Sequence, residues 1–242
     1  MPGAKTSGKV LGLIPAKGGS TRLARKNLRE LAGRSLLAWA AGAAKESGIF
    51  DRLIVSTEDE GVAQEARDLG LDVPFVRPPE LARDPAGVAQ VALHALDKME
   101  ELGEHYDTIV SLLPTCPLRS AEDIRGAYRL FVERRGATVL SVSEFEHTPL
   151  AALGTTDDGL LEPYMPQYFG RKSQEMPKAY RPNGAVHVLD VRRFRETKID
   201  IAPPLVAYVM PIERSFDIDT EADLRAAEIH LTLQGATDPA VT

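Results

Sequence analysis

The chain has 242 residues and a formal net charge of −6 at pH 7, and this length can bury a substantial core as one domain. The acidic balance argues against a nucleic-acid-binding protein, whose charge is basic over a whole face. The only cysteine, Cys116, excludes an intrachain disulfide, and the five histidines are scattered without the spacing of metal ligands.

The first residues, MPGAKTSGK, lack the apolar stretch of a signal peptide. No apolar run in the chain approaches the length of a membrane span. We therefore expect a flexible leader over residues 1–8 and a cytoplasmic protein with neither membrane nor nucleic-acid partners.

Apolar runs typical of strands alternate with helical patterns along the chain. The strand-like runs are Val10–Ile14, Leu53–Ser56, Val73–Val76, Thr108–Leu113, Thr138–Val142, Ala185–Leu189 and Leu205–Met210. The helical patterns are Ser35–Ser47, Glu58–Leu69, Val88–Leu102, Ala121–Arg134 and Glu221–Leu233. Helix starts are supported by S/T-x-x-D/E boxes that pair Thr57 with Glu60, Ser120 with Asp123, and Thr220 with Asp223. This βαβα order predicts a three-layer α/β fold, in which helices cover both faces of a mostly parallel sheet.

The alternation fails between Glu146 and Pro182, a segment rich in proline, tyrosine, glutamine and methionine. A separate lobe, a lid and a dimer arm are all compatible with this composition. Interfaces are enriched in aromatic residues and methionine, which favours the dimer arm. The apolar residues of this kind are Tyr164, Met165, Tyr168, Phe169 and Met176. We expect one domain over residues 9–233, from which residues 146–182 protrude, and a flexible tail over residues 234–242.

A glycine-rich, basic loop follows the first predicted strand. Gly18 and Gly19 have no side chain to keep a ligand from the backbone, so successive N–H groups there can form an anion-binding nest. The cations that can offset phosphate charge are Lys17, Arg22, Arg25 and Lys26. The loop has neither the P-loop order nor the G-x-G-x-x-G order. A turn with solvated basic residues is the alternative interpretation.

Three loops are expected to meet at one edge of the sheet. Lys17–Asn27, Arg77–Asp84 and Pro114–Arg119 each follow a predicted strand. Ligands of open α/β sheets bind in the crevice at the carboxyl ends of the strands. The topology alone therefore predicts a ligand site formed by these loops.

Five segments resemble one family in the same order. IPAKGGSTRLARKN, from Ile14, resembles the IPARGGSKRxPxKN signature of the CMP-sugar-acid synthetases, the cytidylyltransferases that activate sialic acid and related nonulosonic acids. The later segments are RPPELARD from Arg77, LLPTCPLR from Leu112, PKAYRPNGAVHV from Pro177 and FDIDTEADL from Phe216. The resemblance implies a Rossmann-like nucleotidyltransferase fold and CMP transfer from CTP with release of pyrophosphate. It also implies a homodimer in which the irregular segment completes the neighbouring active site.

Asp217 and Asp219 form the second candidate element of the site. Residues two apart in an extended segment point to the same face, so FDID presents two carboxylates side by side. Like charges at this spacing favour a cation, and hard oxygen ligands suit Mg²⁺. The alternative is a solvated edge and a turn residue before a helix. We expect Mg²⁺ to be the cofactor.

The expected reaction is attack of a sugar-acid hydroxyl on the α-phosphorus of CTP, catalysed mainly by positioning and charge neutralisation. Lys17 and Lys26 would act with the two carboxylates by stabilising charge on the β- and γ-phosphates. The resemblance implies that Asn27 and Arg77 help hold the nucleotide and that Pro114 and Thr115 flank its base and ribose. The other expected nucleotide-binding residues are Ala16, Gly18, Gly19, Ser20 and Arg22.

Acceptor binding is expected near the third and fourth segments. A cation beside an ulosonate carboxylate is physically sensible, and Tyr180 can pack on the sugar ring. The expected acceptor-binding residues are Leu113, Arg171, Gln174, Lys178, Tyr180 and Asn183. Surface or dimer contacts are the alternative for each, and Asn183-Gly184 is also a turn signal.

Two departures from the family pattern affect the expected substrate. Lys17 stands where arginine is usual, and Leu113 stands where a glutamine is common. PKAYRPNGAVHV is more similar to sialic-type and legionaminic-type members than to pseudaminic-type members, so we expect a nine-carbon 2-keto acid as acceptor. Kdo or a phosphonate is the enzymatic alternative. A regulatory nucleotide-binding module without turnover is the alternative from another class.

Overall fold

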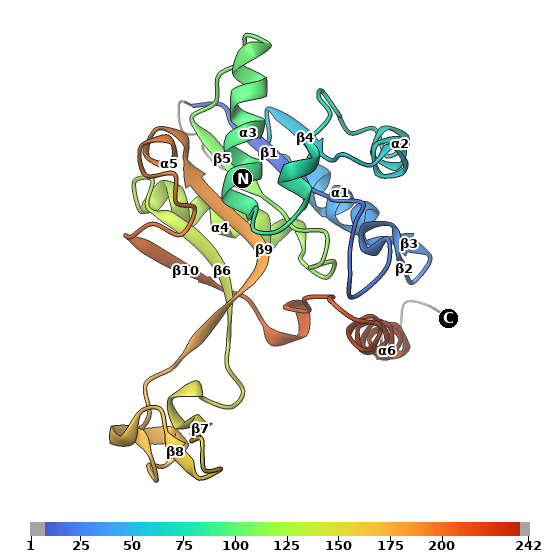
Figure 1. The fold of residues 1–242 in the computed structure, drawn as a ribbon. Helices are drawn as coiled ribbons and strands as arrows, with labels where there is room; N and C mark the ends of the chain where they lie inside the picture. The colour runs from blue at the N-terminus through green and yellow to red at the C-terminus, as the bar shows by residue number, and fades with distance from the viewer. Residues whose placement is uncertain (1–7, 238–242) are drawn as a thin grey trace.

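The computed structural model describes residues 8–237. Most of the predicted leader and the last five residues of the predicted tail therefore lie outside the described residues. A six-stranded sheet forms the centre of the molecule, in the order β10-β6-β9-β5-β1-β4 (Figure 1). Its strands are β1 (Val10–Pro15), β4 (Arg52–Ser56), β5 (Thr108–Ser111), β6 (Thr138–Glu144), β9 (Tyr180–Asp190) and β10 (Leu205–Val209).

The sheet is mostly parallel, as the sequence predicts. β1 pairs in parallel with both β4 and β5, and β10 pairs in parallel with β6. β9 is the exception, because it runs antiparallel between β5 and β6. The carboxyl ends of β1, β4 and β5 therefore lie at the same edge, where the predicted loops Lys17–Asn27 and Pro114–Arg119 begin.

Helices cover both faces of the sheet. The helices are α1 (Leu36–Ser47), α2 (Glu60–Asp68), α3 (Val88–Glu101), α4 (Ala121–Glu133), α5 (Val191–Thr197) and α6 (Glu221–Thr237). Val10 and Ile14 of β1 pack in one buried cluster with α1, α2 and α4. Leu11 and Leu13, which alternate with them, pack in another cluster with α3 and α5. The predicted three-layer α/β fold is confirmed, and no helix within residues 8–237 is long and apolar enough to cross a bilayer.

Several local predictions need correction. Val73–Val76 forms no strand: Pro74 interrupts the run, Val76 is 73% exposed, and the nearby pairing is a single bridge from Ile54 to Asp72. α2 begins after Asp59, whose carboxylate accepts from the Val62 N–H at 2.9 Å, and not after Thr57. The boxes at Ser120 and Thr220 are confirmed. α6 continues to Thr237, four residues beyond the predicted end at Leu233.

The irregular segment protrudes as an arm. β6 and β9 run out of the sheet together and carry a small hairpin made of β7 (Leu153–Thr155) and β8 (Leu161–Pro163) (Figure 1). Tyr164 is 74% exposed and Phe169 is 59% exposed, and Met165 is exposed as well. Tyr168 and Met176 are half-buried. The arm thus presents large apolar side chains to solvent that the chain itself does not cover.

A second small hairpin connects the basic loop to α1. It consists of β2 (Glu30–Leu31) and β3 (Arg34–Ser35), and α6 packs against it through a separate buried cluster that contains Leu31 and Leu224. The segment before α6 carries the predicted carboxylate pair. This packing therefore brings the end of the chain back to the basic loop.

Candidate active site

The loop after β1 is held against neighbouring loops by backbone contacts. The Ala16 N–H donates to the Ser56 carbonyl at 3.0 Å, which continues the pairing of β1 with β4. The Asn27 amide is buried, and its Nδ2 donates to the Lys17 carbonyl at 2.7 Å, which closes the loop across ten residues. The backbone of Arg77 joins the same edge, because its N–H donates to the Thr57 carbonyl at 2.9 Å. The predicted meeting of these two loops is confirmed.

The carboxylate of Glu58 lies inside this junction. Its Oε1 accepts from the Gly18 N–H at 2.8 Å, and its Oε2 accepts from Nε and Nη2 of Arg77 at 3.1 and 2.7 Å. Arg77 is 3% exposed. Gly18 and Arg77, both predicted to contact the nucleotide, thus have an internal anion as partner. The sequence pattern did not indicate a role for Glu58 in the site, because Glu58 is the first residue of a predicted helix.

Asp219 joins the end of the chain to the basic loop. Its Oδ1 lies 2.7 Å from Lys26 Nζ, and its Oδ2 lies 2.7 Å from Arg22 Nη1. The Lys26 side chain is 14% exposed and that of Arg22 is 65% exposed, so the pair with Lys26 is the better shielded of the two. Residues from the first and last of the five segments are therefore in direct contact.

Asp217 lies beside the loop that follows β5. The Ile218 N–H donates to the Thr115 carbonyl at 2.8 Å, and the Thr115 side chain hydrogen-bonds to Asp217. Restricted hydration, together with the nearby charge of Asp219, raises the pKa of Asp217, against the opposing effects of Thr115 and Lys26. Its side chain is still exposed to solvent, so an incoming cation can reach it. Two carboxylates that repel one another in this way suit a divalent cation.

The two carboxylates fit a magnesium site of the kind that substrate completes. Within residues 8–237, no group of three or more His, Cys, Asp or Glu side chains is placed to hold a metal ion. Mg²⁺ is commonly bound through one or two carboxylates, with waters and substrate phosphates as its other ligands. Asp217 and Asp219 supply such a partial set, and the basic loop beside them can hold the phosphates.

Asn183, a predicted acceptor ligand, lies inside the protein. It is 3% exposed, and its Oδ1 accepts from Ser141 Oγ at 2.6 Å and from the Ala185 N–H at 3.1 Å. Its Nδ2 donates to Ser215 Oγ at 3.0 Å. This geometry corrects the prediction of direct substrate contact, because the amide ties β6, β9 and the segment before Asp217 together.

The PTCPLR segment is likewise fixed from within. Arg119 is 3% exposed and donates to the carbonyls of Leu113 and Ala185, both at 2.7 Å, while burial lowers its pKa to about 10. The Cys116 thiol donates to the Asn183 carbonyl at 2.6 Å, and burial raises its pKa to about 12. A protonated, buried thiol offers no nucleophile. Pro114 is buried, whereas the Leu113 side chain is half-buried and contacts the turn at Gly184.

The remaining predicted acceptor residues belong to the arm. Arg171, Gln174, Lys178 and Tyr180 are all exposed. Lys178 Nζ lies 2.8 Å from the carboxylate of Glu144. The arm projects away from the basic loop of the same chain (Figure 1). The structure of one chain therefore does not bring Arg171 and Gln174 to Lys17, Lys26 and Asp219.

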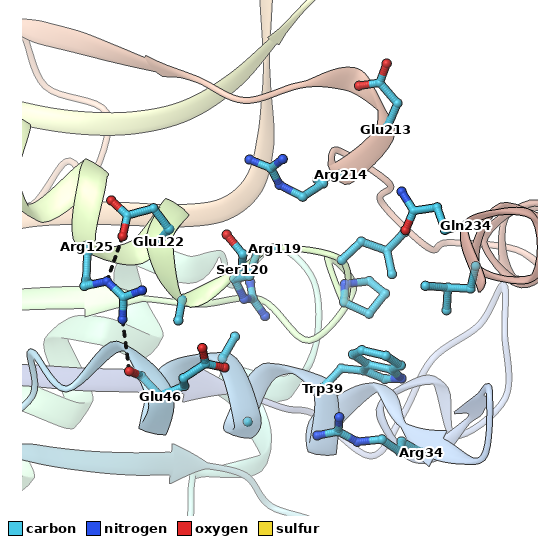
Figure 2. A pocket seen from close by; sticks show the side chains of 16 residues that line it. Arg34, Trp39, Glu46, Arg119, Ser120, Glu122, Arg125, Glu213, Arg214 and Gln234 are labelled. Atoms are coloured by element: carbon cyan, nitrogen blue, oxygen red, sulfur yellow. Dashed lines mark hydrogen bonds and ion pairs between the residues drawn. The ribbon is translucent and has the colours of Figure 1, made fainter. Parts of the chain in front are cut away.

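A cavity of about 510 Å³ lies elsewhere, between α1, the start of α4 and α6 (Figure 2). Pro117, Leu118 and Arg119, the end of the third predicted loop, line it, but none of the individually predicted catalytic, nucleotide-binding or acceptor-binding residues does. Two of its arginines have partners nearby: Arg125 donates to the carboxylate of Glu122 and to the Glu46 carbonyl, and Arg214 pairs with Asp123. The candidate active site is therefore the junction of the basic loop with Asp217 and Asp219.

Comparison with known proteins decides the family. Residues 11–150 match the family model described as cytidylyltransferase. The chain belongs to the cytidylyltransferase family. As a cytidylyltransferase it is a nucleotidyltransferase enzyme, and the basic loop, Arg77 and Thr115 all lie within the matched region.

Two relatives match this cytidylyltransferase over nearly its whole length. It is 30% identical to the pseudaminic acid cytidylyltransferase of Campylobacter jejuni over 221 residues, which cover 91% of this chain and 95% of the relative. It is 32% identical to the CMP-N,N'-diacetyllegionaminic acid synthase of Legionella pneumophila over 222 residues, again 91% and 95%. A solved CMP:2-keto-3-deoxy-manno-octonic acid synthetase complexed with CTP is similar in fold, with a TM-score of 0.68, 14% identity, and coverage of 93% and 99%.

Proposed function

We propose that this cytidylyltransferase transfers CMP from CTP to a nonulosonic acid of the sialic type and releases pyrophosphate. The observation that carries the proposal is the contact of Lys26 with Asp219 at 2.7 Å, because Lys26 is the cation expected to bind phosphate and Asp219 is a candidate metal ligand. The relatives named for pseudaminic and legionaminic acids support an acceptor of this class.

In this proposal the loop residues hold the triphosphate. Lys26 is positioned by Asp219, so little side-chain freedom is lost when it meets a phosphate. Lys17 has an exposed side chain on a backbone anchored by Asn27, which suits it to contact a second phosphate. Gly19 has open space where a side chain would stand, so phosphate oxygens can approach its backbone.

Chemistry at the α-phosphorus needs no covalent enzyme intermediate. The acceptor hydroxyl oxygen forms the new bond to phosphorus and gives up its proton to solvent, and the bond to the pyrophosphate oxygen breaks in line with the new one. Asp217 and Asp219 would hold Mg²⁺, which when bound neutralises charge on the phosphate oxygens. Lys17 and Lys26 stabilise the departing pyrophosphate, whose negative charge grows in the transition state.

The proposal includes a homodimer. The exposed residues of the arm would then lie at an interface, and Arg171, Gln174, Lys178 and Tyr180 would contact the acceptor in the active site of the partner subunit. Sedimentation velocity over a range of concentrations tests this: a monomer at every concentration would refute the dimer.

The test of function is incubation with CTP, Mg²⁺ and separate acids, with mass spectrometry of CMP conjugates and measurement of pyrophosphate. The panel contains a sialic-type, a legionaminic-type and a pseudaminic-type acid, Kdo and a simple phosphonate. We expect the highest kcat/KM with a nine-carbon acid. A tenfold preference for Kdo or the phosphonate, about 1.4 kcal/mol of transition-state discrimination, would overturn the acceptor assignment.

A further inference from the structure

The carboxylate of Glu58 accepts hydrogen bonds from both the Gly18 N–H and the Arg77 guanidinium. Its carboxylate is 18% exposed, and the guanidinium that it faces is 3% exposed. One carboxylate thus joins three segments: the basic loop, the β4–α2 turn and the chain that leads to Arg77. No part of the reaction described above uses Glu58.

The ion pair between Glu58 and Arg77 is stable in the free protein. Arg77 is buried, and Glu58 is its charged partner in a pair that uses both Nε and Nη2. Displacement of Glu58 by an incoming phosphate would require all three of its hydrogen bonds to Gly18 and Arg77 to break. In the free protein the Gly18 N–H is thus occupied by Glu58, which differs from its predicted role as a direct phosphate ligand.

Close packing fixes the loop at the same point. A Cβ atom on Gly18 would lie 2.4 Å from the Cβ of Asp59, the residue next to Glu58, so only glycine allows this approach. At Gly19, by contrast, a Cβ would meet no heavy atom within 4 Å. The loop backbone is therefore closely packed at Gly18, whereas the backbone of Gly19 has free space beside it.

We propose that Glu58 is a positioning residue for CTP: it holds Gly18 so that the backbone of Gly19 and Ser20 faces the phosphates. This inference rests on the proposed use of CTP. Glu58 itself touches no phosphate, because its two oxygens are committed to Gly18 and Arg77.

Two substitutions of Glu58 distinguish the effect of its charge from the effect of its size. Glu58→Gln keeps the length of the side chain but offers only one acceptor oxygen, and its NH₂ group meets the donors of Gly18 or Arg77. Glu58→Asp is one methylene shorter but keeps the charge and both acceptors. If Glu58 only fills space, glutamine is harmless and aspartate is not; if it positions the loop, the order is reversed.

Two measurements on the full chain test the proposal. Amide hydrogen exchange of residues 16–22 in the ligand-free protein reports the hold on the loop, and calorimetric titration with CTP and Mg²⁺ reports its effect on binding. We expect Glu58→Gln to speed exchange and to weaken CTP binding by about tenfold or more, equivalent to about 1.4 kcal/mol. Glu58→Asp should restore most of both.

Glu60→Gln is the matched control, because the Glu60 side chain is 77% exposed and its carboxylate pairs with Arg67 of the same helix at 2.7 Å. It should change neither readout. Exchange and CTP affinity at wild-type level in Glu58→Gln would overturn the inference. Failure of the wild-type protein to bind CTP would instead refute the proposed function, while the exchange data would still decide whether Glu58 holds the loop.

Discussion

Replacing Asp217 by asparagine removes a carboxylate whose pKa the folded protein raises. A raised pKa means that the ionised group opposes folding at neutral pH, by an amount that disappears as the pH falls through the folded pKa towards the ordinary value of about 3.9. Asp217→Asn is isosteric and cannot ionise. We therefore expect it to be neutral or stabilising at pH 7, and to abolish most turnover.

The size of the stability effect follows from the surroundings of Asp217. Desolvation of the carboxylate and repulsion by Asp219 oppose ionisation, whereas Thr115 and Lys26 favour it, so the net cost is about 1 kcal/mol or less. For a chain of this size, 1 kcal/mol corresponds to about 2–4 °C in Tm, so Tm should rise by at most about 4 °C. Loss of one electrostatic element of a site commonly lowers kcat by about 10²–10³-fold.

Asp219→Asn serves as the comparison, since its carboxylate is paired with Lys26 and Arg22. Both partners retain some solvent contact, so this variant should lose about 1 kcal/mol of stability or less, together with its turnover. Thermal unfolding at pH 7 and pH 5, and initial rates at saturating Mg²⁺, check both variants. Near-normal kcat in both, or a Tm loss in Asp217→Asn larger than that in Asp219→Asn, would contradict this reasoning.

Three other changes test separate parts of the structure. Lys17→Ala and Lys26→Ala should lower CTP turnover by about tenfold or more with a smaller effect on Tm, and the reverse pattern in melting and rate measurements would make their role structural. Leu113→Gln should shift kcat/KM among acids by up to about tenfold, because an amide adds hydrogen bonds that leucine lacks; an unchanged acid profile would remove Leu113 from the acceptor site. Burial opposes ionisation of Asp123, but hydrogen bonds from Arg214 and Ser120 outweigh it and lower its pKa. Arg214→Met should therefore cost about 2 kcal/mol in urea unfolding, constant from pH 8 to pH 5 and shrinking below about pH 4, where the pair is lost in the wild-type protein as well; a cost that does not shrink would contradict the ion pair.

Most of the sheet could be predicted because its strands are short apolar runs with clear ends. The run at Val73–Val76 was misread for the same reason: its composition is that of a strand, but Pro74 lacks an N–H and the neighbouring pairing ends at Asp72. The arm was identified by the failure of periodicity. Its hairpin could not be predicted, since β7 and β8 are three residues each and carry no alternation.

The site was predicted in part. Pattern and resemblance placed Lys26 and Asp219 in one site, and the structure brings them into contact across 193 positions. The partners of buried polar groups were not predictable, because they depend on tertiary packing. Asn183 reads as a turn residue, yet its amide is enclosed by β6 and by the segment before Asp217. Glu58 reads as part of a helix start, yet its carboxylate binds Gly18.

Carboxylates already hold two of the four loop cations predicted to offset phosphate charge, and also Arg77, which was predicted to bind the nucleotide. Asp219 holds Lys26 and Arg22, and Glu58 holds Arg77. This arrangement fixes the direction of each cation before substrate arrives, so less reorganisation is needed on binding. It also cancels much of the positive charge that attracts a triphosphate in an acidic chain. In the proposed reaction, a divalent cation that arrived with the nucleotide would restore that attraction beside Asp217, whose exposed carboxylate has a raised pKa. We therefore expect the basic loop and the carboxylates of Asp217 and Asp219 to bind the nucleotide and its cation together.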